Sequence, residues 1–93
     1  MTPEGGRLVL VGGHESAQGR DLARLLDALP GASVTIAGRP LHNAVTSLLA
    51  QGAKRVTVLP MTWGRDPVLV ADTARTLDWL ATGPGAGRLA LGL

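Results

Sequence analysis

Three short, continuous apolar runs divide the chain, and each is followed directly by a cluster of glycine and polar residues. The runs cover residues 8–11, 34–37 and 56–59. Continuous apolar runs of this length are typical of strands buried on both faces of a parallel sheet. The clusters that follow them therefore fall at the carboxyl edge of that sheet, where open α/β folds bind their ligands.

The segments after these runs carry apolar residues at helical spacing. Apolar side chains recur every three or four residues within 18–29, 42–51 and 66–81, which predicts three amphipathic helices. Asp66 followed by Pro67 is typical of an N-cap and first helical residue, and Gly52 supplies a C-cap position. The expected buried stripe of the last helix consists of Val70, Thr73, Ala74, Leu77 and Leu80.

The end of the chain adds a fourth candidate strand at 88–93. The resulting βαβαβαβ pattern favours an α/β three-layer sandwich around a parallel sheet of about four strands. We expect the flavodoxin-like strand order 2-1-3-4, which places the switch point between the first and third strands, beside His14 and Trp63.

Composition narrows the class of protein. Ninety-three residues with 45% hydrophobic side chains predict a single domain, 1–93, with a modest core. The net charge of +2, without a block of like charges or interleaved aromatic residues, argues against nucleic acid. The absence of cysteine, of a leader-like start and of any apolar stretch near 18 residues favours a cytoplasmic protein without a membrane segment.

Both histidines of the chain fall in the clusters at the expected sheet edge. His14 could act as a metal ligand or general base, since a neutral imidazole serves both uses, or it could be a solvated loop residue. His42 has the same alternatives but lies farther from the switch point. Dinucleotide and P-loop fingerprints are absent, and so is the G-x-S-x-G elbow of hydrolases.

Three further side chains have both a structural and a chemical interpretation. Glu15 could favour the dipole of the following helix or accept a proton, and Asp66 could cap a helix or donate an oxygen ligand. Trp63 could stack on a planar ligand or pack against its own loop. Trp79, near the end of the last helix, is interpreted as a core or subunit-contact residue.

Two segments carry a resemblance to a known family. The turn at 11–16, valine-glycine-glycine-histidine-glutamate-serine, and the run at 51–60, which ends in Val56-Thr57-Val58-Leu59-Pro60, are similar to the small class II sirohydrochlorin and cobalt chelatases. The resemblance covers most of the chain. It implies a chelatase-like half-domain that inserts a divalent metal, Co²⁺, Fe²⁺ or Ni²⁺, into a sirohydrochlorin-like tetrapyrrole. The metal is then a substrate, and no organic cofactor is expected.

The resemblance also implies roles for individual residues. His14 corresponds to the family histidine that binds the incoming metal and accepts pyrrole protons. The family's second histidine is missing, because the loop at 61–66 contains none, and Asp66, Glu15 or His42 would have to replace it. Ser16, Arg39, Trp63 and Arg65 are then expected to contact the tetrapyrrole, the two arginines through its carboxylates.

Short members of this family pair as homodimers, and this chain ends on a strand where the family continues into a helix. We therefore expect either a homodimer or a piece of a longer two-domain protein. Two alternatives stay open: a non-catalytic relative that binds a metal or tetrapyrrole, and a dimerisation domain that has kept the fold.

Overall fold

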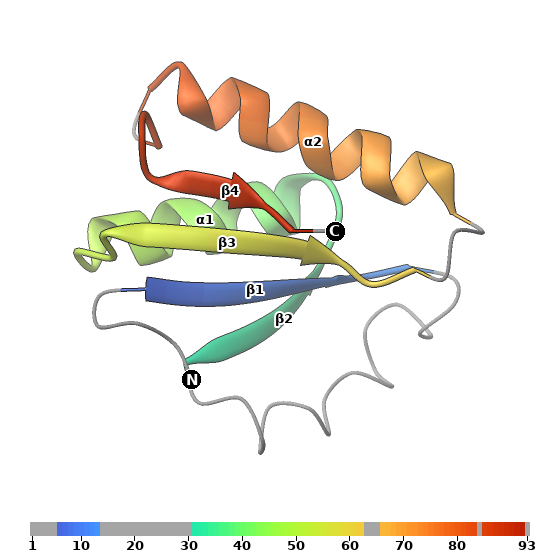
Figure 1. Ribbon diagram of the computed structural model, residues 1–93, viewed down its shortest axis with the longest axis horizontal. Helices are drawn as coiled ribbons and strands as arrows, with labels where there is room; N and C mark the ends of the chain where they lie inside the picture. The colour runs from blue at the N-terminus through green and yellow to red at the C-terminus, as the bar shows by residue number, and fades with distance from the viewer. Residues whose placement is uncertain (1–5, 14–30, 63–65, 84, 93) are drawn as a thin grey trace.

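A computed structural model describes residues 6–13, 31–62, 66–83 and 85–92 of the chain. Within them it forms four strands and two helices (Figure 1). These elements are β1 (Gly6–Gly12), β2 (Ala32–Ile36), α1 (Arg39–Ala50), β3 (Arg55–Pro60), α2 (Pro67–Ala81) and β4 (Leu89–Leu91). The helix expected over 18–29 lies outside the described residues.

The four strands form one parallel sheet in the order β2-β1-β3-β4. This confirms the predicted α/β class and the predicted strand order. β1 pairs with β2 on one side and β3 on the other, so Val9 lies between Ser33 and Val58. The topology places the carboxyl ends of β1, β2 and β3 at one edge of the sheet.

One face of the sheet is covered by both helices. Alternate residues of the two central strands point to this face, where they form a single core with apolar residues of α1 and α2. The strand residues are Val9, Val11, Val56 and Val58, and the helix residues are Leu41, Val45, Leu49, Leu69, Leu77 and Leu80. Leu10 alternates with the first set, so it belongs to the opposite face, and it is also fully buried.

Helix α1 begins earlier than the sequence pattern predicts. The pattern predicts a start at about His42, but the helix begins at Arg39, with Pro40 in its first turn. Proline is tolerated in the first turn, since its missing N–H has no partner there in any case. The helix ends at Ala50, and Gly52 has a φ of +96°, as expected for a C-cap glycine.

Helix α2 confirms the predicted cap and corrects the predicted stripe. Asp66 is its N-cap, and the helix runs from Pro67 to Ala81. The buried residues are Leu69, Thr73, Leu77 and Leu80, so Leu69 replaces Val70 at the first position. None of the helices in the described part of the chain is long and apolar enough to cross a membrane.

Arg88 connects the last strand to the end of α1. Its Nε donates to the Ala53 carbonyl at 3.1 Å, and its Nη2 donates to the Leu49 carbonyl at 3.1 Å and to the Ala53 carbonyl. The cation therefore lies at the carboxyl end of α1, where the helix dipole favours positive charge. β4 itself is shorter than the predicted 88–93, and Leu91 keeps 38% of its surface exposed.

Candidate functional site

A cleft of about 370 Å³ opens at the carboxyl edge of the sheet. We call it the carboxyl-edge cleft. It is formed by the ends of β1 and β2 and the first turns of α2. Its lining residues are Gly12, Gly13, Ile36, Ala37, Asp66, Val68, Leu69 and Asp72. This is the edge at which the sequence predicts ligand binding.

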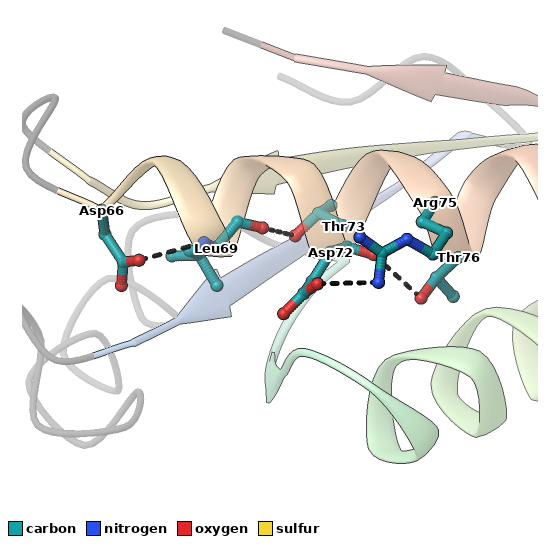
Figure 2. Close-up of polar contacts among 6 residues, drawn as sticks. All are labelled: Asp66, Leu69, Asp72, Thr73, Arg75 and Thr76. Atoms are coloured by element: carbon teal, nitrogen blue, oxygen red, sulfur yellow. Dashed lines mark hydrogen bonds and ion pairs between the residues drawn. The ribbon is translucent and has the colours of Figure 1, made fainter.

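Asp66 lies where α2 and β1 meet. Its Oδ1 accepts a hydrogen bond of 3.0 Å from the backbone N–H of Leu69, which satisfies one of the free donors in the first turn (Figure 2). The other oxygen, Oδ2, faces β1: a Cβ atom at Gly13 would lie only 2.9 Å from it. Glycine at position 13 therefore lets the carboxylate approach the strand end closely.

A second carboxylate borders the same cleft. Asp72 projects from the same side of α2 as Asp66 (Figure 2) and forms an ion pair of 3.2 Å with Arg75. The sequence pattern does not indicate a carboxylate pair that includes Asp72, because its spacing of six residues from Asp78 does not make the two neighbours on a helix face. The available signal is Leu69, which lies three residues from Asp66 and three from Asp72. A residue at this spacing is a neighbour of both carboxylates on the helix surface.

The predicted site residues divide into three groups. His14, Glu15, Ser16, Trp63 and Arg65 lie outside the described residues. Asp66 lies in the carboxyl-edge cleft. Arg39 and His42 line a different cleft, so the structure does not place His42 beside Asp66. Among residues 6–13, 31–62, 66–83 and 85–92, no three His, Cys, Asp or Glu side chains could together hold a metal ion.

This second cleft lies between the two helices and measures about 530 Å³. We call it the α1–α2 cleft. The start of α1 supplies Gly38, Arg39, His42 and Asn43, and α2 supplies Arg75, Thr76 and Trp79. The two clefts are neighbours. Ala37 lines one and Gly38 the other, and the Asp72–Arg75 ion pair joins their rims.

Trp79 corrects one expectation. It is not a core residue, since 74% of its surface is exposed, whereas the alternative interpretation as a subunit-contact residue stays a prediction. It lies two positions after Leu77, off the buried stripe of α2, and its ring is tilted by 57° against that of His42 at a centroid distance of 6.0 Å. The indole therefore presents a large apolar surface at the α1–α2 cleft.

Comparisons with models of protein families, with curated proteins and with solved structures find no match for this chain. The resemblance to chelatases therefore rests on its sequence motifs. The structure explains what one of these motifs does: Ala53, Val56 and Val58 are buried core residues of β3 and the turn before it. This segment therefore carries information about the fold, whereas the residues expected to carry chemistry lie in the turn that begins at Gly12.

Proposed function

We propose that the protein is a chelatase-like protein of tetrapyrrole biosynthesis, which inserts Co²⁺ or Fe²⁺ into a sirohydrochlorin-like macrocycle. One observation supports this proposal above all. The Asp66 carboxylate lies against Gly13 at the end of β1, and His14 is the next residue of the sequence. An imidazole and a carboxylate from two neighbouring segments are a suitable ligand pair for such ions.

The reaction needs few protein groups. A divalent metal enters the macrocycle and two pyrrole protons leave, so the protein must release the ion readily and accept protons. In the proposal, His14 binds the ion and accepts a proton, and Asp66 is the second ligand and acceptor. The cap bond uses Oδ1 of Asp66, while Oδ2 faces the strand end. Glu15 is a further candidate acceptor.

The remaining roles follow from the resemblance. Ser16, Trp63 and Arg65 would contact the tetrapyrrole, and Arg39 would reach its carboxylates from the neighbouring cleft. His42 lines that same neighbouring cleft, so the proposal assigns the metal to His14 and Asp66 only. A cytoplasmic location, which the absence of cysteine favours, is part of the proposal.

A homodimer is also part of the proposal. β4 is the last strand in the order of the described sheet, and Leu91 is 38% exposed on it. Sheet edges with exposed apolar side chains favour pairing with another chain. A second copy would cover this edge and provide the larger cleft that a macrocycle needs.

The test follows the absorbance of sirohydrochlorin with Co²⁺. Wild-type protein should accelerate insertion, and His14→Ala should reduce the acceleration by about 10²-fold or more, the usual contribution of a general base. His42→Ala is the matched control, because it removes the only other histidine, and it should retain activity. Asp66→Asn, which keeps the cap, should lose part of the activity. An unaccelerated reaction with wild-type protein would contradict the enzyme proposal.

A non-catalytic relative that binds a metal or tetrapyrrole is the second candidate. It is favoured by the missing second histidine, since the loop at 61–66 contains none. Equilibrium binding separates the candidates. This alternative predicts Co²⁺ binding that His14→Ala abolishes, together with an insertion rate equal to that without protein.

A further inference from the structure

The α1–α2 cleft has a chemical character opposite to that of the carboxyl-edge cleft. Two guanidinium groups line it, from Arg39 and Arg75, and none of the acidic side chains in the described part of the chain does. Asp72 pairs with Arg75 from the neighbouring rim. The charged side chains of this lining therefore favour an anion, whereas Asp66 and Asp72 favour a cation in the carboxyl-edge cleft.

The start of α1 adds to this preference. Its N-cap is Gly38, which provides no side-chain cap, and the first turn contains no acidic residue. The N–H groups of a first turn and the positive end of the helix dipole both attract negative charge. At α2 the corresponding donor, the N–H of Leu69, is already satisfied by the Asp66 carboxylate.

The aromatic side of the cleft indicates what the anion is attached to. Trp79 is 74% exposed, although it is one of only two residues of the Phe, Trp and Tyr group in the chain. The leucines of the same helix, Leu69, Leu77 and Leu80, are buried. An indole left open beside the His42 ring offers a flat surface for stacking. The volume of about 530 Å³ lies within the range of roughly 300–1,000 Å³ typical of small-molecule sites.

We propose that the α1–α2 cleft binds a flat aromatic anion, with its ring against Trp79 and its negative group between Arg39 and Arg75. Guanidinium groups form charge-assisted, bidentate hydrogen bonds with carboxylates and with phosphate groups. The shared chemistry is therefore an aromatic ring that carries a carboxylate or a phosphate ester. This site shares Arg39 with the proposed tetrapyrrole contact, but it uses neither His14 nor Asp66, the two proposed metal ligands.

The test titrates metal-free protein with 2-naphthoate and follows the indole N–H signal of Trp79 by NMR. The signal should shift and saturate, and the neutral 2-naphthamide should leave it unchanged. Arg39→Gln and Arg75→Gln should each weaken binding by about fivefold to tenfold, the usual effect of losing a charge-assisted hydrogen bond at an accessible site. Arg55→Gln is the matched control, because Arg55 is exposed outside the cleft, and its affinity should equal that of the wild type.

Two further arms identify the ligand class. 2-Naphthyl phosphate binding more tightly than 2-naphthoate assigns a phosphate ester, and the reverse order assigns a carboxylate. Cyclohexanecarboxylate, which has no aromatic ring to stack on Trp79, should bind more weakly than 2-naphthoate. Trp79→Leu should remove this difference in affinity. Binding to that variant is followed at the backbone amide of Asn43, which also lines the cleft. The substitution is at an exposed position and should leave the fold intact.

Several results would overturn the proposal. Equal affinity for the acid and the amide, or unchanged affinity in both arginine variants, would show that the guanidinium groups do not bind the ligand. An unchanged Trp79 indole signal with both 2-naphthoate and 2-naphthyl phosphate at millimolar concentration would show that the cleft does not bind aromatic anions. A Trp79 signal that moves with protein concentration in the absence of ligand would assign the cleft to a second copy of the chain. None of these results depends on the cobalt insertion assay.

Discussion

The two described helices begin in similar ways, yet their starts favour opposite charges. Each follows a strand of the same sheet, and each has a proline in its first turn. Helix α2 starts with Asp66, whose carboxylate caps the Leu69 N–H. Helix α1 starts with Gly38, which has a φ of +91° and no side chain to offer, and is followed directly by Arg39.

This difference shows how one fold can present two kinds of site a few residues apart. A helix N-terminus attracts negative charge, and α2 satisfies that preference with its own carboxylate, whereas α1 leaves it open. The carboxyl end of α1 is instead satisfied from outside the helix, by Arg88. A charged side chain therefore stabilises the start of α2 and the end of α1. Substitutions at Arg88, Gly38 and Asp66 test what each of these helix ends contributes to stability.

The largest effect is expected at Arg88. Arg88→Met removes the donors to the Leu49 and Ala53 carbonyls and leaves partly buried acceptors without a charged partner. We expect the free energy of unfolding to fall by about 2–3 kcal/mol, measured by urea denaturation. Arg55→Met, at an exposed position, is the control and should change stability little. Equal stability of the two variants would mean that Arg88 does not stabilise the end of α1.

An intermediate effect is expected at Gly38. A Cβ atom there would meet nothing within 4 Å, but the φ of +91° is strained for any L-residue with a side chain. Gly38→Ala should therefore destabilise the protein by about 1–2 kcal/mol through the backbone alone. Gly83→Ala is the control, since it has equal space and no positive φ. An unchanged free energy of unfolding in Gly38→Ala would show that α1 can begin with ordinary backbone geometry.

The smallest effect on stability, and the most informative one, is expected at Asp66. Asp66→Ala should cost about 1 kcal/mol by removing the cap, whereas Asp66→Asn should cost only a few tenths, because asparagine caps equally well. Asp78→Ala, at an exposed position late in α2, serves as the control. The asparagine variant therefore separates the two roles of Asp66: it should keep the stability of the helix and lose Co²⁺ affinity.

The sheet could be predicted from the sequence because its signals are local. The run at 8–11 is apolar throughout, and parallel strands joined by helices allow few topologies. The N-cap at Asp66 was predicted for the same reason, since an acidic residue before proline is a local pattern. These features need no knowledge of what lies across the molecule.

Other features depend on contacts between distant segments. Arg88 lies 35 residues from Ala53, and nothing in the sequence near either residue indicates their hydrogen bond. The α1–α2 cleft brings together Arg39 and Arg75, which belong to different helices. Of the two interpretations of Trp79, a core residue or a subunit-contact residue, the exposure of 74% excludes the first. The helical position of Trp79, two residues after the buried Leu77, is the local signal that it lies off the buried stripe.

The most direct test of the opposite character of the two helix starts is one NMR titration series on a single protein sample. Paramagnetic Co²⁺ should broaden the signals of Gly12, Gly13 and Leu69 and leave the indole N–H of Trp79 sharp. 2-Naphthoate should then shift the Trp79 indole and the Arg39 amide, with little change at Gly13. Perturbation of the same residues by both ligands would contradict the account, and so would the absence of any response at Gly13 to the metal.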